Sequence, residues 1–168
     1  MTPQETLDKL KAKIGADAIT TSEFRDNFRA HVPNGKLLAA LTCLKNECGY
    51  DFLSDLTAVD YLGYPTATTD RFAVVYCLLN TNDGNRFYVK TMVNDPDPTL
   101  PTASHLWAGA DWPEREVYDM YGIKFAGHPD LRRILMPDEF TSYPLRKDYP
   151  LRGRGERHNF PILTRAEG

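Results

Sequence analysis

Several titratable residues lie close together in the second half of the sequence and could serve as general acids or bases: Glu114, Glu116, Asp119 and His128. A hydrolase would place such groups beside its bound substrate. The spacing also has a simpler explanation. Glu114 follows Asp111 by three residues, as in a helix capping box, and Arg115 precedes Asp119 by four, as in a helical ion pair. His128 lies in a Gly-His-Pro-Asp turn, where its ring can hydrogen-bond locally. We therefore expect no catalytic residue in this chain, and a hydrolase using Glu114 or His128 is the alternative.

The other residues that could bind a metal or cofactor lack the required spacing. Cys43 and Cys48 are five residues apart, on different faces of a predicted helix, and Cys77 lies in a predicted strand, so the sequence has no C-x-x-C pair. A lone G-x-G at residues 153–155 neither follows a strand nor begins a helix. The histidines are scattered: His31, His105, His128 and His158. We expect no metal and no cofactor in this chain.

The C-terminal part of the sequence combines prolines, apolar side chains and arginines. Pro129, Pro137, Pro144 and Pro150 recur every six to eight residues, which excludes a long helix or a central strand. Planar guanidinium groups beside apolar side chains are typical of protein–protein interfaces. The arginines of this part are Arg132, Arg133, Arg146, Arg152, Arg154 and Arg157. We expect an extended tail that binds a partner, and we expect its first part also to fold back on its own domain.

These patterns divide the chain into an α+β domain, residues 1–125, and a partner-binding tail, residues 126–168. The candidate partner contacts lie on the helix at residues 111–121 and on the tail. They are Glu114, Arg115, Glu116, Asp119, His128, Asp130, Arg132, Arg133, Leu135, Arg146, Lys147, Asp148 and Tyr149.

Helix signals recur along the chain. Thr2, Pro3 and Glu5 form a capping box with proline at the first helical position, and Gly15 ends this helix. Apolar residues at helical spacing predict a second helix over residues 35–48. The helix at residues 111–121 begins at Asp111 as its N-cap and ends at Gly122. We also expect a short helix at residues 104–108.

The rest of the domain has strand periodicity. Residues 18–32 can hold two short strands, and residues 52–62 a longer one. Residues 71–79 are apolar on both faces, as in a strand covered on both sides. An Asn-Asp-Gly-Asn turn joins them to a hairpin partner at residues 86–93. We therefore predict an α+β fold: an antiparallel-rich sheet with a β-meander, helices packed on one face, and an extended proline-punctuated C-terminal tail.

Composition narrows the class of protein. The 168 residues are 42% hydrophobic and 26% charged, with a formal net charge of −3. From residue 132 onward the sequence has 8 Lys+Arg against 5 Asp+Glu, too sparse an excess for a dedicated nucleic-acid site. The longest apolar run, residues 72–79, is too short to cross a bilayer. Three cysteines without regular spacing and no secretory signal indicate a soluble chain in a reducing compartment.

The sequence from residue 114 to 135, EREVYDMYGIKFAGHPDLRRIL, followed by PLRKDYPL at 144–151, resembles a known family. It is similar to the 30 kDa subunit family, also called the C subunit, of proton-pumping NADH:quinone oxidoreductase, respiratory complex I. DLTAVDY at 55–61, FAVVYCLL at 72–79 and LPTASHLWAGADW at 100–112 resemble the same family in the same order. The resemblance covers about residues 50–155.

This resemblance implies a structural subunit of the peripheral arm of the complex, without catalytic residues of its own. The chain would pack on the quinone-site-forming subunit and its iron–sulfur neighbour, at the cytoplasmic side of the inner membrane. FMN, iron–sulfur clusters and quinone would belong to partner subunits, which pass electrons from NADH to quinone with proton translocation. The membrane would be contacted only indirectly.

Close relatives of that complex leave alternatives open. The equivalent subunit of a membrane-bound hydrogenase or formate-hydrogenlyase complex, or of the ferredoxin-dependent photosynthetic complex, shares the resembled motifs. A stand-alone hydrolase and a nucleic-acid-binding module are alternatives of other classes. Turnover by the isolated chain would indicate the first of these, and salt-dependent binding to nucleic acid the second.

Overall fold

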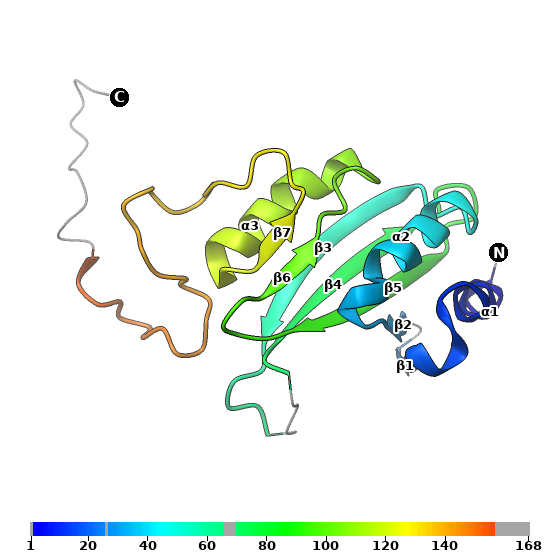
Figure 1. The fold of residues 1–168 in the computed structure, drawn as a ribbon, viewed down its shortest axis with the longest axis horizontal. Helices are drawn as coiled ribbons and strands as arrows, with labels where there is room; N and C mark the ends of the chain where they lie inside the picture. Colours follow the sequence, from blue (N-terminus) through cyan, green and yellow to red (C-terminus); the bar gives the residue numbers. More distant parts are fainter. Residues whose placement is uncertain (1, 26, 66–69, 157–168) are drawn as a thin grey trace.

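The computed structural model describes residues 2–25, 27–65 and 70–156, and within them the chain has an α+β fold (Figure 1). The described α-helices are α1 (Pro3–Ile14), α2 (Leu37–Asn46) and α3 (Asp111–Tyr121). The described strands are β1 (Thr20–Phe24), β2 (Asn27–His31), β3 (Phe52–Asp60), β4 (Phe72–Leu79), β5 (Arg86–Val93), β6 (Thr99–Pro101) and β7 (Lys124–Ala126). Short 3-10 helices occupy Ala16–Ala18, Asn34–Lys36 and Ala108–Ala110.

The main sheet has the strand order β1-β2-β5-β4-β3. Strands β3, β4 and β5 form the predicted meander, in which Phe72 lies opposite Val93 and Leu79 opposite Arg86. The β1–β2 pair is also antiparallel, whereas β2 joins β5 in parallel, so the sheet is mixed. A separate two-stranded parallel ribbon, β6 with β7, lies beside α3. The predicted fold class is confirmed.

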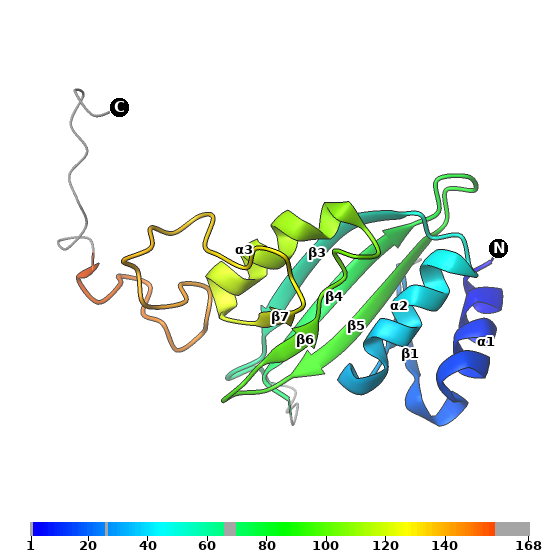
Figure 2. The same cartoon turned by 45° about the horizontal axis from the view of Figure 1, so that its top comes forward.

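The helices cover one face of the main sheet (Figure 2). Helix α2 lies across β5, α3 lies over β3, and α1 packs against α2 at the edge near β1. Alternate strand residues turn their apolar side chains toward these helices and form one core with them. The largest fully buried side chains are Tyr50, Tyr76, Phe72, Phe87, Phe125, Leu10, Leu37, Leu41, Leu44, Leu78, Leu100 and Ile123.

Strand β4 departs from the prediction that both of its faces are covered. Its Phe72, Val74, Tyr76 and Leu78 side chains are buried beneath the helices, whereas Val75, Cys77 and Leu79 on the opposite face are only half-buried. The physical reason is the placement of the helices, all of which pack on the first face in the described part of the chain. The second face is open.

Two helix ends follow the sequence signals. At α1 the Glu5 amide donates to Thr2 Oγ1 at 3.3 Å, and the Thr2 amide donates to Glu5 Oε2 at 2.9 Å, which completes the predicted capping box. At α3 the chain ends the helix through Gly122 in the left-handed conformation, with φ of 76°.

Two predicted details are wrong. Residues 104–108 form a hydrogen-bonded turn and the start of a 3-10 helix, not an α-helix, because the Trp107 amide donates back to Ala103 and the turn then stops. Asp111 is not the N-cap of α3, since the preceding residue takes that position without a side-chain hydrogen bond. The 3-10 turn that leads into α3 replaces the capping box.

Candidate functional site

Helix α3 is the base on which the candidate site is built, and its acidic residues face inward. Glu114 is fully buried, where Oε2 accepts a hydrogen bond from Thr102 Oγ1 at 2.5 Å and Oε1 accepts one from the Ala103 amide at 2.6 Å. Glu114 therefore ties α3 to the loop after β6. Because its side chain reaches no surface in this structure, it is not positioned as a partner contact, and a substrate has no access to it.

Asp119, also fully buried, fixes the first part of the tail. Its Oδ2 accepts hydrogen bonds from the successive amides of residues 134–136 at 3.1, 2.8 and 2.8 Å. Arg133 donates to the other oxygen, Oδ1, at 2.6 Å. The predicted pair of Asp119 with Arg115 is wrong, because Arg115 instead donates to the Arg132 carbonyl oxygen. Asp119 is an internal anchor and not a surface contact.

Asp60 at the end of β3 fixes the second part of the tail. Arg71 donates to both of its oxygens, at 3.2 and 3.0 Å, and the Lys147 amide donates to Oδ2 at 2.9 Å. Arg71 also pairs with Asp95 at 2.7 Å and with Asp148 at 2.9 Å. This network joins two loops at the end of the meander to a tail segment far away in the sequence.

Aromatic packing closes the space between these two anchors. A Cβ atom at Gly122 would lie 2.5 Å from a ring carbon of Tyr143, so the glycine is needed both for its φ and for this close approach. Arg146 lies over the Tyr143 ring, 4.9 Å from its centroid, and donates to the Tyr121 carbonyl oxygen at 2.5 Å. Tyr149 packs edge-on against the buried Phe140 ring, with 5.9 Å between centroids.

The pKa values of the two anchors, Asp119 and Asp60, shift in the opposite direction to that of Glu114. Burial opposes ionisation of Asp119, but hydrogen bonds from the tail amides and Arg133 outweigh it and hold its pKa below the ordinary value. For Asp60, burial is likewise outweighed by Arg71 and by the Lys147 and Leu62 amides, which lowers its pKa. Burial raises the pKa of Glu114 to about 7, although its hydrogen bonds oppose the rise. The anchors are therefore carboxylates, and Glu114 titrates near neutrality.

His128 holds the turn that connects β7 to the tail. Its Nδ1 accepts a hydrogen bond from the Asp130 amide at 3.0 Å, so the proton of the neutral ring lies on Nε2. Nε2 lies 3.2 Å from the Asp111 carbonyl oxygen and 3.9 Å from Glu114 Oε2. The predicted local role of His128 is confirmed, and because its side chain is fully covered it is not a surface contact.

The remaining predicted partner contacts fall into two groups, side chains that are covered within the chain and side chains that lie on the surface. Arg133 and Arg146 have largely covered side chains that pair within the chain, Arg115 is buried, and Tyr149 is half-buried. The residues that lie on the surface are Glu116, Asp130, Arg132, Leu135, Lys147 and Asp148. Arg132 pairs only with its neighbour Asp130, at 2.8 Å, among the described residues.

Sequence reasoning missed several residues of this region. Trp112 is 66% exposed beside the Arg115 guanidinium, and Leu151 is exposed on the tail, as is Leu145, an apolar side chain of the tail expected from the sequence. With Arg132 and Leu135 they form what we call the tail surface: Trp112, Arg132, Leu135, Leu145 and Leu151. Asp60 and Arg71 were also missed. Asp60 had a signal, because it continues the inward alternation of Leu56 and Ala58 along β3.

No group of three or more potential metal ligands occurs within residues 2–25, 27–65 and 70–156. No helix in these segments is long and apolar enough to span a bilayer. Arg157 and His158, which were named from the sequence, lie outside the described residues.

Comparison with known proteins supplies the family. A family described as "Respiratory-chain NADH dehydrogenase, 30 Kd subunit" matches residues 30–155. The chain is 43% identical to the C subunit of NADH-quinone oxidoreductase from Citrifermentans bemidjiense, over 86% of this chain and 88% of that protein. It is 52% identical to NADH-quinone oxidoreductase subunit 5 of Thermus thermophilus, over 61% of this chain and 52% of that protein.

Similarity to solved structures supports the same family. A trypsin-resistant fragment (1-134) of Nqo5 superposes with a TM-score of 0.71 at 36% identity, covering 78% of this chain and all of the fragment. A chain of the membrane-bound sulfane sulfur reductase, an archaeal respiratory membrane complex, superposes with a TM-score of 0.73 at 26% identity, covering 96% of this chain and 93% of that one. The sequence motifs, the fold and these matches together show that the chain belongs to the 30 kDa subunit family of respiratory-chain NADH dehydrogenase.

Proposed function

We propose that this chain is a structural subunit of the peripheral arm of a proton-pumping NADH:quinone oxidoreductase, and that it binds its partners through the tail surface. One observation carries the proposal: the chain uses its own buried carboxylates to hold the tail in place while leaving large apolar side chains of that tail exposed. Leu135 is 59% exposed although its amide is bound to Asp119. A segment that is ordered before binding loses less conformational entropy when a partner docks.

The chemistry of the exposed residues fits a protein partner. Tryptophan and arginine, here Trp112 and Arg132, are residue types that anchor protein–protein contacts, and the exposed Leu135 adds apolar area beside them. The partners we propose are the quinone-site-forming subunit and its iron–sulfur neighbour. The chain itself would carry no cofactor and no catalytic residue, and FMN, iron–sulfur clusters and quinone would be held by the other subunits. It would lie at the cytoplasmic side of the inner membrane without inserting into it.

The division into a domain and a tail is part of the same proposal. The Nqo5 fragment that resists trypsin covers 78% of this chain, which supports a stable domain followed by a separable segment. The hydrogen bonds of Asp119 and Asp60 add that residues 133–147 pack on that domain, so the tail makes more internal contacts than its prolines suggest. We propose that residues 1–125 form the domain and that the tail docks onto it.

The test is to replace Leu135 and Leu145 together by Asp in the full chain. Both side chains are exposed, so the melting temperature of the isolated chain should change little, since surface substitutions are usually within about ±0.5 kcal/mol. The amount of chain recovered in the assembled complex should fall strongly. Exposed Leu38 on α2 offers a matched control, and Leu38→Asp should leave assembly unchanged. Normal assembly of the double variant would contradict the proposal.

The absence of a resident cofactor is tested separately. Elemental analysis of the purified, chelator-washed chain should find neither iron nor zinc in stoichiometric amounts. A second candidate function is the equivalent subunit of a related membrane-bound reductase complex. It is favoured by the 96% coverage of this chain in the sulfane sulfur reductase superposition. The subunits that co-purify with the chain from its native membrane distinguish the two.

A further inference from the structure

The face of the main sheet that the helices leave open carries an apolar surface. Strand β4 contributes Val75 and Cys77, and β3 contributes Val59, whose side chains are only partly covered. A strand that is apolar on both faces is typical of a sheet covered on both sides, yet the described part of this chain covers only one. Apolar side chains that gather on an uncovered face mark an interaction site.

The open face is hollowed along its centre. A groove of about 340 Å³ runs across it, which we call the sheet groove, with Val59, Val75 and Cys77 as its floor. Tyr61 and Tyr88 flank the floor, and Phe24, which is 58% exposed, stands at the β1 end.

One side of the sheet groove is positively charged. Lys90 Nζ lies over the Tyr61 ring, 4.6 Å from its centroid, and donates to the Tyr61 hydroxyl at 2.8 Å. Arg29 lies on the adjacent strand, opposite Tyr88, and its Nε is buried without a hydrogen-bond partner among the described residues. A buried N–H that remains unpaired is costly, so this group has an acceptor to gain.

His31 lies beside the same positive charges, because it is paired with Lys90 across β2 and β5. Burial lowers the pKa of His31, and the positive charges of Lys90 and Arg29 lower it further. Burial raises the pKa of the Cys77 thiol in the groove floor to about 11, and the carboxylate of Asp55, which lies opposite Cys77 on β3, adds to the rise. The groove is therefore positive toward β2 and β5 and more negative toward β3, which sets the direction in which a charged ligand would lie.

The shape of the site indicates a polypeptide and not a small molecule. Small-molecule pockets are concave and enclose most of their ligand. The sheet groove is an open depression on a broad face, and its lining reaches from Phe24 on one edge strand to Val59 on the other. Contact across several strands is the geometry of a protein interface.

We propose that the sheet groove docks a segment of a neighbouring subunit that carries a carboxylate between apolar side chains, with the carboxylate on Arg29 and Lys90. The apolar side chains would cover Val59, Val75 and Cys77. Arginine suits this role because its fork of N–H groups can bind a carboxylate through two hydrogen bonds. The inference rests on the proposed function, because it assumes that the chain is assembled with other subunits.

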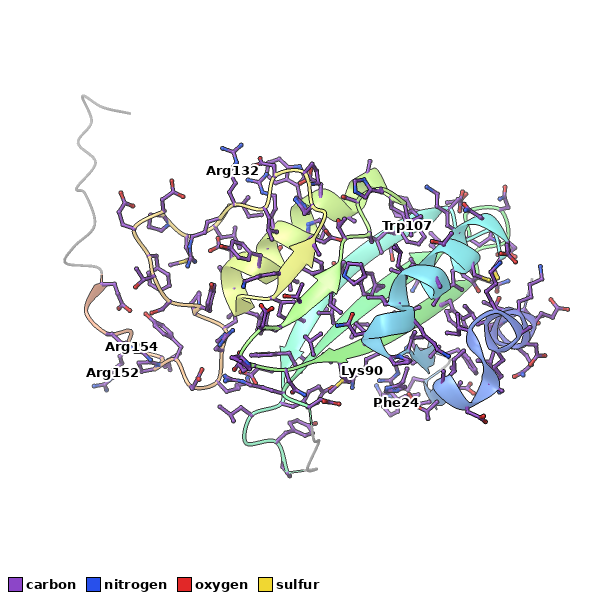
Figure 3. All side chains as sticks on the ribbon, in the orientation of Figure 1. Phe24, Lys90, Trp107, Arg132, Arg152 and Arg154 are labelled. Atoms are coloured by element: carbon purple, nitrogen blue, oxygen red, sulfur yellow. The ribbon has the colours of Figure 1, made fainter. Side chains whose placement is uncertain are left out.

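This site is separate from the tail surface. Figure 3 shows Phe24 and Lys90 toward the α1 end of the molecule, and Arg132, Arg152 and Arg154 at the opposite end. The chain would therefore contact partners through two surfaces, and each can be tested without the other.

The native Cys77 thiol reports on occupancy of the groove. We suggest alkylation with N-ethylmaleimide at one fixed pH, compared between the full chain alone and the purified complex, with each cysteine quantified by mass spectrometry. Cys77 should react at least about tenfold more slowly in the complex, the factor for a contact worth ~1.4 kcal/mol. Cys43 and Cys48 are buried in the core and serve as controls for unfolding.

Variants of Arg29 test the charge. Arg29→Glu should return Cys77 in the complex toward its reactivity in the free chain, and Arg29→Lys should give an intermediate rate because it keeps the charge and loses the fork. Lys13→Glu makes the same charge change on the surface of α1, where Lys13 pairs with Glu47, and should have no effect. A photo-crosslinking residue in place of Tyr88 should capture a segment that contains Asp or Glu.

Two results would overturn the inference while leaving the proposed function intact. Cys77 would react equally in the complex and the free chain, although a cysteine placed at Leu135 becomes protected. Or the cross-link from position 88 would reach lipid, a second copy of this chain, or a segment without a carboxylate. If both positions stay reactive in the complex, the proposed function fails as well.

Discussion

Buried charged groups are paired within the chain where the tail packs on the domain, whereas one on the open face of the main sheet is not. Beneath the tail, Asp119 on α3 and Asp60 at the end of β3 are buried, and each accepts hydrogen bonds from internal donors. On the open face of the sheet, Arg29 has a buried Nε without a partner in the described residues. Buried charges that are paired within the chain hold its own structure together, whereas an unpaired donor beneath an uncovered apolar face indicates a contact still to be made. Charge alone therefore does not identify a partner site.

The largest effect should come from Asp119→Ala. It leaves Arg133 and the amides of residues 134–136 without their acceptor, and removing one side of a buried ion pair costs about 3–5 kcal/mol. Denaturant unfolding of the full chain measures this. Asp130→Ala removes the exposed partner of Arg132 and should cost about 0–1 kcal/mol. If Asp119→Ala and Asp130→Ala lower the free energy of unfolding equally, Asp119 is no more an internal anchor than the exposed Asp130.

Gly122→Ala should destabilise the docked tail by about 1–3 kcal/mol, the range for a strained backbone conformation. The new Cβ also collides with Tyr143, since it would lie 2.5 Å from the ring. In a Tyr143→Ala background the collision is absent, so the same substitution should cost less. Thermal unfolding of the wild type, the two single variants and the double variant gives the coupling free energy between positions 122 and 143. If the cost is unchanged, the ring does not pack on this glycine.

Glu114 should give the chain a pH dependence opposite in sign to that of the two anchors. Its pKa is raised from 4.5 to about 7 in the folded chain. Between these two pH values the folded state still holds a proton that the unfolded state has lost, so unfolding releases a proton and stability falls as pH rises. The pKa values of Asp60 and Asp119 are lowered, so their contribution is present above the ordinary Asp pKa of about 4 and is lost as pH falls below it.

Unfolding free energies of wild type and Glu114→Gln from pH 4 to 8 test this sign. Glutamine mimics the protonated acid, so the variant should lose the decline in stability between about pH 4.5 and 7. The glutamine side-chain amide can donate to Thr102 Oγ1, and the Thr102 hydroxyl can then still donate to Ser104 Oγ, so the substitution keeps the local hydrogen bonds. An unchanged pH profile would mean that Glu114 is ionised throughout.

The smallest effect on the isolated chain should come from Arg29→Ala. Its Nε has no internal acceptor in the described residues, so the substitution breaks no hydrogen bond of that atom and should change stability least among these variants. The same variant should weaken assembly, because the proposed carboxylate loses its partner. A large loss of stability in the isolated chain would show that Arg29 supports its own sheet, as Asp119 supports the tail.

The sequence predicted the parts of the fold that local patterns control. The capping box of α1, the end of α3 at Gly122 and the β3–β4–β5 meander all depend on residues a few positions apart. It did not predict the anchors, because their partners are distant. Asp60 and Lys147 are 87 residues apart, and neither spacing nor periodicity reports on such a pair.

Local rules also failed where tertiary contacts were stronger. Asp119 and Arg115 have the spacing of a helical ion pair, which is worth about 0.2–0.5 kcal/mol, whereas three amides and Arg133 offer Asp119 a larger set of bonds. Asp111 and Glu114 have the spacing of a capping box, but Glu114 turns inward to Thr102. In the candidate site, exposed and buried positions alternate irregularly along a tail without periodicity, so the sequence could name the segment but not its outward residues.

Amide hydrogen exchange of residues 134–136 in the isolated full chain tests most directly whether the chain itself holds the tail in place. These amides donate to one oxygen of Asp119, and we predict that they exchange slowly without any partner and exchange fast in Asp119→Ala. If they exchange at the rate of an unprotected segment in the isolated chain and slow down only in the assembled complex, the partner orders the tail and the internal anchors do not.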